Sequence, residues 1–260
     1  MSAGTLYLIP ATLGDLKDAA GSASETVTNS GATASATLIE ASLPAAVRAR
    51  ALSLNSFAVE NAKTARAFLK AIGVMRPIAE LDISEIGHAP DEKSLKPLVD
   101  KLLRGIDLGV LAEAGCPGIA DPGAQLVRLA HAQGIRVVPL TGPSSILLAL
   151  MASGLDGQRF AFAGYAPVKS PQREETLKKL EARSARERET EILIETPYRN
   201  AALMQALLAA LKPDTRLCVA IDLTLTTESI LTRRVSEWRK APPAPALLDK
   251  KPAVFLFLAT

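Results

Sequence analysis

The sequence GVLAEAGCPGIADPG, from Gly109 to Gly123, decides the fold of this chain of 260 residues. The apolar residues Val110 to Ala112 give way abruptly to a loop that contains three glycines and two prolines. A buried strand that ends in such a loop is a common way to build a ligand site in an open α/β sheet. Glycine allows the backbone to approach a ligand closely, and proline reduces the conformational entropy that the loop loses on binding. This stretch therefore predicts a ligand-binding loop at the end of a strand.

Two other stretches have the same design. RVVPLTGPSS, from Arg136 to Ser145, is a second apolar run that ends in a Thr-Gly-Pro-Ser-Ser turn, and a predicted helix over 124–133 separates it from the first. Near the start of the chain, TLYLI (Thr5–Ile9) is a β-rich run that is closed by Pro10 and a turn through Gly14. Taken alone, each of these stretches is best interpreted as a tight turn. Because all three occur in order along the chain, we expect them to form one shared ligand site.

The spacing of strands and helices predicts an α/β protein with two domains. Strands and helices alternate up to Ala152, which is typical of a mostly parallel sheet covered on both faces. After Gly154 several strands follow one another without helices, which predicts a mixed C-terminal sheet. We therefore expect one domain over residues 1–153 and another over 154–260. Residues 19–35, mostly Ala, Ser, Thr and Gly, are expected to form a flexible surface insertion.

The region before the central loop contains two amphipathic helices, predicted over 61–72 and 91–104. The first carries Lys63, Arg66 and Lys70 at spacings of three and four, which places these charges on one face. The run from Asp82 to Pro90 between the two helices is expected to be rich in loops. A stripe of this kind is most often a solvated face, and it favours RNA binding only weakly.

Composition limits the classes of function. Apolar residues make up 48% of the chain, and the net charge of +3 permits binding to nucleic acid without arguing for it. The two cysteines, Cys116 and Cys218, offer neither a disulfide framework nor a metal-ligand spacing, which suits a reducing cytoplasm. No signal peptide is expected, and the most apolar window, 137–155, is broken by Pro and Gly and does not predict a membrane span. We expect a cytoplasmic protein without a metal or a membrane partner.

Six stretches together resemble a known family. They are GTLYLIPATLGD (4–15), VENAK (59–63), AEAGCPGIADPG (112–123), GIRVVPLTGPSS (134–145), RFAFAGYAP (159–167) and ETPYR (195–199). In this order they are similar to the tetrapyrrole methylase superfamily, and within it to the ribosomal RNA small-subunit methyltransferase I family. The resemblance implies two α/β domains, a mostly parallel N-terminal sheet, a mixed C-terminal sheet and a cofactor cleft between the domains.

The resemblance also implies that the chain binds S-adenosylmethionine. Backbone carbonyls and carboxylates suit the positive charge of its sulfonium group, and the chain contains no G-x-G-x-x-G dinucleotide motif. The cofactor-binding residues that the resemblance implies are Pro10, Leu13, Gly14, Glu113, Ala114, Gly115, Thr141, Gly142, Pro143, Ser144 and Ser145 from the first domain's loops, with Tyr198, Ala220 and Asp222 from the second domain.

The implied reaction is methyl transfer to a ribose 2′-hydroxyl of small-subunit ribosomal RNA. The implied partners are a second copy of the chain, in a homodimer, and ribosomal RNA or the small ribosomal subunit. A hydroxyl is a poor nucleophile unless its proton is accepted, so we predict Glu60 as the proton acceptor, with Lys63 and Arg66 holding phosphate or ribose. An equally good interpretation is that Glu60 has no catalytic role and simply caps the helix that starts at Asn61.

Two other functions stay open from the sequence. The mild net charge favours methylation of a tetrapyrrole-like or other small molecule. Departures from the family pattern favour a diverged, non-catalytic paralogue that binds the cofactor: Glu60-Asn61-Ala62-Lys63 stands where the family has Glu-Asp-Thr-Arg, and this trades a bidentate Arg for a point charge.

Overall fold

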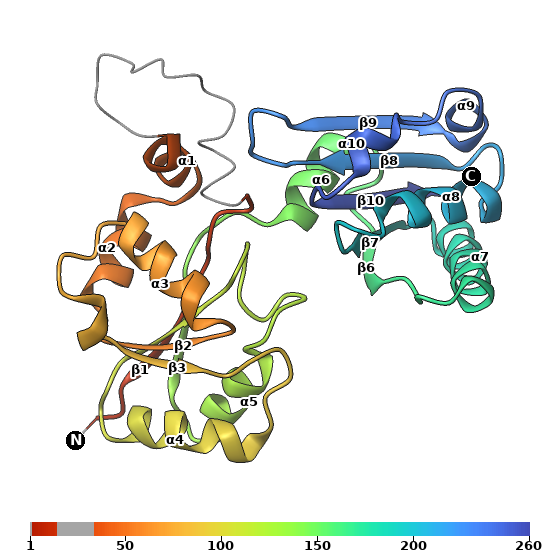
Figure 1. Ribbon diagram of the computed structural model, residues 1–260. Helices are drawn as coiled ribbons and strands as arrows, with labels where there is room; N and C mark the ends of the chain where they lie inside the picture. Colours follow the sequence, from red (N-terminus) through yellow and green to blue (C-terminus); the bar gives the residue numbers. More distant parts are fainter. Residues whose placement is uncertain (1, 15–33) are drawn as a thin grey trace. The chain divides into compact units, whose positions relative to one another are not determined.

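The computed structural model describes residues 2–14 and 34–260, which fall into two units, Met1–Ser144 and Ser145–Thr260 (Figure 1). The predicted insertion at 19–35 lies outside the described residues except for its last two positions, which belong to helix α1 (Ala34–Ser42). The second unit begins before helix α6 (Ser145–Ser153), whereas the sequence places the boundary after this helix.

The first unit is built on a parallel sheet of five strands in the order β3-β2-β4-β1-β5. Every neighbouring pair is parallel, with β1 between β4 and β5 and β2 between β3 and β4. All five strands therefore present their carboxyl ends at the same edge, which is where ligands bind in open α/β sheets. The strands are β1 (Thr5–Ile9), β2 (Ser56–Val59), β3 (Asp82–Glu85), β4 (Leu108–Leu111) and β5 (Arg136–Pro139).

Helices cover both faces of this sheet, and strand alternation assigns each residue to a face. Ile9 and Phe57 pack against Phe68 and Leu69 in one core, whereas Leu6 and Leu108 pack against α4 and α5 in the other. Figure 1 shows α2 and α3 on one side of the sheet and α4 and α5 on the other. These helices are α2 (Ala45–Ser53), α3 (Ala62–Ala71), α4 (Glu92–Leu103) and α5 (Ala124–Ala132), with a short 3-10 turn at Ile78–Glu80.

The second unit contains a mixed sheet in the order β6-β7-β10-β8-β9. The β6–β7 pair is parallel and the other three pairs are antiparallel. The strands are β6 (Phe160–Tyr165), β7 (Thr190–Glu195), β8 (Arg216–Ile221), β9 (Ser229–Arg234) and β10 (Ala253–Leu258). The predicted fold class, with a parallel N-terminal sheet and a mixed C-terminal sheet, is confirmed.

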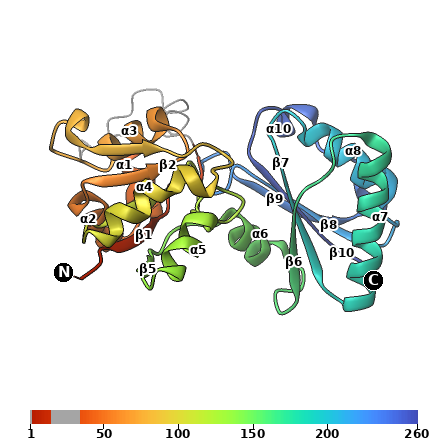
Figure 2. The same ribbon diagram turned by 90° about the horizontal axis from the view of Figure 1, so that it is seen from below.

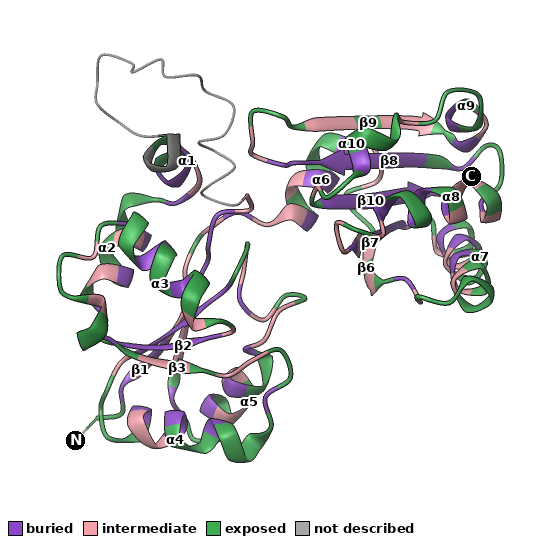
Figure 3. Cartoon of the chain, viewed as in Figure 1, coloured by how far each residue is buried: buried purple, intermediate pink, exposed green. Residues whose placement is uncertain are grey.

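One face of the second sheet packs against long helices, and the other packs against α6. Phe255 and Phe257 of β10 are fully buried in a core with Leu203 and Leu207 of α8. Figure 2 shows α7 and α8 lying on the same side of this sheet, and Figure 3 shows β8 and β10 buried along most of their length. Helix α6 packs on β8, β9 and β10. The remaining helices are α7 (Ser170–Glu187), α8 (Asn200–Ala210), α9 (Val235–Lys240) and α10 (Pro245–Leu248).

Two elements of the first unit differ from the sequence prediction. Residues Asp82–Glu85, expected within a loop-rich run, form the edge strand β3, whose side chains are all exposed or half-buried. Because no apolar alternation marks this strand, only its pairing with β2 reveals it. Helix α1, in a segment with no apolar periodicity, places Ile39 in the same core as α3.

Candidate functional site

Three loops of the first unit meet at the carboxyl edge of its sheet, as the sequence predicts. The loop after β1 and the loop after β4 form an isolated β-bridge between Ala11 and Gly115, in which the Ala11 amide donates to the Gly115 carbonyl at 2.9 Å. The Cys116 thiol donates to the Pro143 carbonyl at 3.4 Å and joins the loop after β4 to the loop after β5. The structure therefore brings together the loops that contain Pro10 to Gly14, Glu113 to Gly115 and Thr141 to Ser144.

Two glycines make this close approach of the loops possible. Gly115 has φ +68°, and a Cβ there would lie 3.2 Å from Leu13 Cδ2 and 3.5 Å from the Pro143 carbonyl oxygen. A Cβ at Gly142 would lie 2.2 Å from Pro10 Cγ, which is closer than packed atoms allow. The meeting of these loops thus depends on backbone without side chains at both positions.

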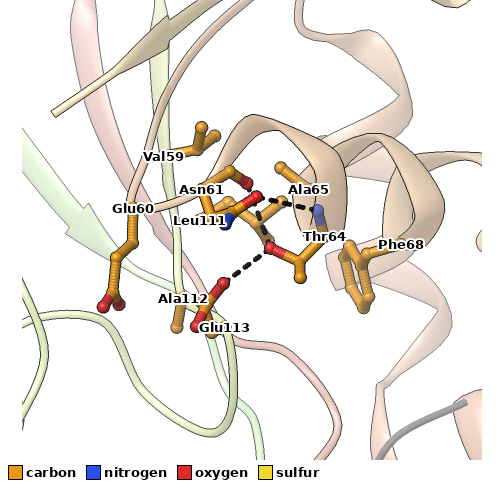
Figure 4. A pocket seen from close by; sticks show the side chains of 9 residues that line it. All are labelled: Val59, Glu60, Asn61, Thr64, Ala65, Phe68, Leu111, Ala112 and Glu113. Atoms are coloured by element: carbon orange, nitrogen blue, oxygen red, sulfur yellow. Dashed lines mark hydrogen bonds between the residues drawn. The ribbon is translucent and has the colours of Figure 1, made fainter. Parts of the chain in front are cut away.

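A small open pocket lies beside these loops, between the end of β2, the end of β4 and the start of α3. Its wall is mainly apolar, and Glu60, Asn61, Thr64 and Glu113 supply the polar groups (Figure 4). The Thr64 hydroxyl donates to Glu113 Oε1 at 2.7 Å, a hydrogen bond that crosses the pocket between α3 and the loop after β4. The apolar residues of the wall are Val59, Ala65, Phe68, Leu111 and Ala112.

Side chains from two other segments fix the start of α3 at the pocket. Asn61 is the N-cap, and its Oδ1 accepts from the Lys63 amide at 2.8 Å and from the Thr64 amide at 3.4 Å. The Glu85 carboxylate, at the end of β3, accepts from the Ala62 amide at 2.9 Å. These acceptors satisfy backbone N–H groups that have no partner within the helix. Asn61 is therefore the N-cap of α3. Glu60, for which helix capping was the alternative to a catalytic role, does not cap this helix.

Glu60 is the most buried polar group of the pocket wall. Its side chain is 8% exposed, and it forms an ion pair with Nδ1 of His88, whose side chain is 87% exposed. Burial raises the pKa of Glu60, the nearby Glu113 carboxylate raises it further, and His88 opposes both effects. The carboxylate thus has a stronger affinity for a proton than an exposed glutamate, and its partner His88 reaches solvent.

Asp121 is a third carboxyl group coupled to the pocket. Burial, and then the charges of Glu60 and Glu113, raise the pKa of Asp121 to about 7. Its Oδ2 atom is buried and has no hydrogen-bond partner among the described residues. Asp121 lies in the central loop without any local pattern that assigns it a role, because only the folded chain brings the three carboxyl groups together.

Glu60, Lys63 and Arg66 are predicted to act together, but Lys63 and Arg66 point away from this pocket. Lys63 and Arg66 are exposed, and neither forms part of the pocket wall, whereas Asn61, Thr64, Ala65 and Phe68 of the same helical segment do. At about 100° per residue, Lys63 and Arg66 fall on the face of α3 opposite Ala65 and Phe68. The structure therefore separates Glu60 from these two cations.

The predicted residues of the second unit have different surroundings within it. Tyr198 is 81% exposed, and Ala220 is fully buried in β8. Asp222 is buried, with φ +52°, and its Oδ2 accepts from Lys251 Nζ at 2.6 Å and from the Thr227 hydroxyl at 2.7 Å. Glu195 pairs with Arg199 at 2.5 Å. Ser145, the last residue of the predicted Thr-Gly-Pro-Ser-Ser turn, is the first residue of α6.

Asn61 and Thr64 have roles at the pocket that the sequence predictions do not include. An Asn immediately before an amphipathic run is an N-cap signal, and a hydroxyl three residues later lies on the same end of the helix. Over the described ranges 2–14 and 34–260, no group of three or more His, Cys, Asp or Glu side chains is arranged to hold a metal ion. Nor does any helix in these ranges have the length and apolarity to cross a membrane.

Comparison with known proteins agrees with this architecture. The family described as Tetrapyrrole (Corrin/Porphyrin) Methylases matches residues 5–238. The chain therefore belongs to the tetrapyrrole methylase family, and the predicted resemblance is confirmed.

Its relatives include proteins named ribosomal RNA small subunit methyltransferase I. The one from Haemophilus influenzae is 30% identical over 237 residues, which are 91% of this chain and 72% of that protein. The one from Vibrio cholerae is 37% identical over 140 residues, which are 54% of this chain and 47% of that protein. The Xylella fastidiosa protein is 36% identical over 173 residues, 66% of this chain and 60% of that protein. The chain thus spans about half to three quarters of the length of these relatives.

Solved structures support the fold. The crystal structure of a diphthine synthase matches with a TM-score of 0.61 at 14% identity, over 98% of this chain and 90% of that chain. A cobalt precorrin-4 methyltransferase matches with a TM-score of 0.56 at 15% identity, over 98% and 94% of the two chains. At these identities the similarity concerns the arrangement of strands and helices.

Proposed function

We propose that this chain is an S-adenosylmethionine-dependent methyltransferase that methylates a ribose 2′-hydroxyl of small-subunit ribosomal RNA. The observation that carries the proposal is the similarity over 91% of the chain to the Haemophilus influenzae protein named for methylation of small-subunit ribosomal RNA. Family membership over residues 5–238 agrees with a methyltransferase fold.

The loops at the carboxyl edge of the first sheet fit the proposed cofactor. Gly115 and Gly142 hold three loops so close that a Cβ at either would contact a neighbouring loop, and the carbonyl oxygens of Gly115 and Pro143 lie where these loops meet. Carbonyl oxygens and the Glu113 carboxylate suit a sulfonium cation. In this proposal Pro10, Leu13, Gly14, Glu113 to Gly115 and Thr141 to Ser144 of the first unit bind the cofactor. A role for Ser145, Tyr198, Ala220 and Asp222 stays a prediction from the family resemblance. The cofactor supplies an activated methyl group.

Glu60 is the proposed proton acceptor for the acceptor hydroxyl. Its carboxylate is nearly buried, and its pKa is raised. A carboxylate with a raised pKa accepts a proton from a hydroxyl group more readily than an ordinary glutamate does. A proton taken by Glu60 is next to the exposed ring of His88, which is in contact with solvent. Thr64 holds the Glu113 carboxylate at the other side of the pocket.

We also propose that the protein acts in the cytoplasm as a homodimer on the small ribosomal subunit. Exposed apolar side chains support a protein interface: Phe160 is 42% exposed on the edge strand β6, and Met151 is 80% exposed on α6. Ribosomal RNA as a substrate supports a cytoplasmic location.

Methyl transfer from radiolabelled S-adenosylmethionine to small ribosomal subunits from cells lacking this protein tests the function. The wild-type chain should label the RNA, and the label should resist alkaline hydrolysis, because a 2′-O-methyl group removes the nucleophile that cleaves RNA. Gly115→Trp should lose cofactor binding by calorimetry, and Glu60→Gln should bind the cofactor but lose roughly a hundredfold or more in rate.

Three other results would each contradict the proposal. Label on a tetrapyrrole in place of RNA would assign a small-molecule substrate. Cofactor binding without transfer to any acceptor would assign a non-catalytic role. Equal labelling by wild type and Gly115→Trp, with both folded by circular dichroism, would remove the proposed cofactor site.

A further inference from the structure

Helix α3 has two chemically different faces. One face lines the pocket through Thr64, Ala65 and Phe68. The opposite face carries Lys63, Arg66 and Lys70, all exposed, which we call the α3 basic face. Lys63 and Lys70 are seven positions apart, or about 10 Å along the helix axis. The basic face therefore forms a short row that ends beside the pocket.

The cations of the α3 basic face have no carboxylate partner among the residues that the structure describes, and α3 itself contains no acidic residue. Helix α7 provides the contrast within the same chain. Its Lys179 pairs with Glu175 at 2.7 Å, and Arg186 pairs with Glu187 at 2.7 Å. Helix α7 therefore carries carboxylates that neutralise these two cations, and the α3 basic face has no such carboxylates.

The arrangement on α3 is unfavourable for the helix itself. Lys63 lies in the first turn, where the helix dipole disfavours positive charge. Lys63 with Arg66, and Arg66 with Lys70, are like charges at spacings of three and four, which repel each other. Lys70, in the last turn, suits the helix dipole, so the dipole disfavours Lys63 alone, while the like-charge spacing disfavours all three residues. An external polyanion would relieve this repulsion.

We infer that the α3 basic face binds the phosphate backbone of the RNA substrate and leads its acceptor nucleotide to the pocket at the start of α3. The inference rests on the proposed function and extends it, because Lys63 and Arg66 then hold RNA outside the pocket rather than act on the reacting hydroxyl. Phosphates along one RNA strand match a row of flexible, singly charged side chains without requiring any base contact.

The test compares two triple variants with the same change in charge. The first is Lys63→Gln, Arg66→Gln and Lys70→Gln on the basic face. The matched control removes three exposed cations at the opposite face of the same sheet: Lys93→Gln, Lys96→Gln and Arg104→Gln, on or next to α4. Binding to a fluorescent small-subunit RNA fragment is measured between roughly 0.05 and 0.3 M salt.

We expect the basic-face variant to bind RNA roughly a hundredfold more weakly near 0.1 M salt. The slope of log K against log salt should fall in magnitude by about 2, as the loss of three single-strand phosphate contacts requires. The α4 control should stay close to wild type. Affinity for S-adenosylmethionine should be unchanged in both variants. The thermal midpoint of the basic-face variant should equal or slightly exceed that of wild type, since like-charge repulsion is removed.

An equal loss in both variants would show that only net charge matters and would overturn the inference, as would RNA binding that is unchanged in the basic-face variant. Loss of binding to anionic lipid vesicles with RNA binding intact would assign this face to a membrane and would also overturn it. Failure of the wild-type chain to methylate RNA would count against the proposed function, while the comparison of RNA binding would still decide what α3 contacts.

Discussion

At the scale of single residues, Gly142 shows how little space separates the loops of the site. Gly142→Ala would place a Cβ 2.2 Å from the ring of Pro10, which cannot rotate away. We expect this change to lower the free energy of unfolding by about 1–3 kcal/mol, as overpacking does, and to weaken cofactor binding. Chemical denaturation and calorimetry measure the two effects.

Gly157→Ala is the matched control, because its Cβ would meet no atom within 4 Å. Its stability and cofactor affinity should stay within error of wild type. If Gly142→Ala behaves in the same way, the two loops are not in the contact described.

Asp121 should make stability depend on pH. Its pKa of about 7 lies above the value of about 3.9 in an unfolded chain. Its contribution to stability is therefore complete below about pH 4 and is lost as the pH rises through about 7. We expect Asp121→Asn to gain stability relative to wild type between about pH 5 and 8, by on the order of 2 kcal/mol, because partial solvation reduces the full effect.

Urea denaturation at several pH values measures this difference. Glu80→Gln, at an exposed position, is the control and should show a constant difference from wild type. If the difference in unfolding free energy between Asp121→Asn and wild type is also independent of pH, Asp121 is ionised in the folded protein throughout this range.

At the scale of elements, the start of α3 depends on its N-cap residue, Asn61. Asn61→Ala removes the acceptor for the Lys63 and Thr64 amides and should lower the free energy of unfolding by about 1 kcal/mol. Asn61→Asp keeps an acceptor and should stay close to wild type. Urea denaturation distinguishes them. Equal stability of the Ala and Asp variants would show that Glu85, which accepts from Ala62, is sufficient to hold this end of the helix.

At the scale of the whole molecule, the position of α6 decides where the second domain begins. The core around Phe255 and Phe257 lies within the second unit, and Ile146 and Leu150 of α6 are also buried. We expect residues 145–260 expressed alone to unfold cooperatively by circular dichroism. Residues 154–260, which follow the predicted boundary, lose α6 and should be less stable by about 3–6 kcal/mol or aggregate, because β8 and β10 lose a buried face. Equal stability of the two fragments would favour the boundary after 153.

Sequence by itself determined the class of fold and the loops of the site. Apolar runs such as Thr5–Ile9 and Val110–Ala112, each followed by Pro or Gly, were enough to predict parallel strands with functional loops at one edge. These features are local, because the backbone repeats every two residues in a strand and Gly and Pro restrict the chain at their own positions.

Only the tertiary structure decided which side chains act on one another. Polar β3 carries no apolar pattern, so its place beside β2 follows from pairing alone. Glu60 is far in sequence from Glu113 and Asp121, and the effect of these carboxyl groups on the pKa of Asp121 arises only where folding brings them together. The sequence grouped Lys63 with Glu60, yet the turn of α3 separates them. Proximity and desolvation are properties of the packed chain, and no local pattern encodes them.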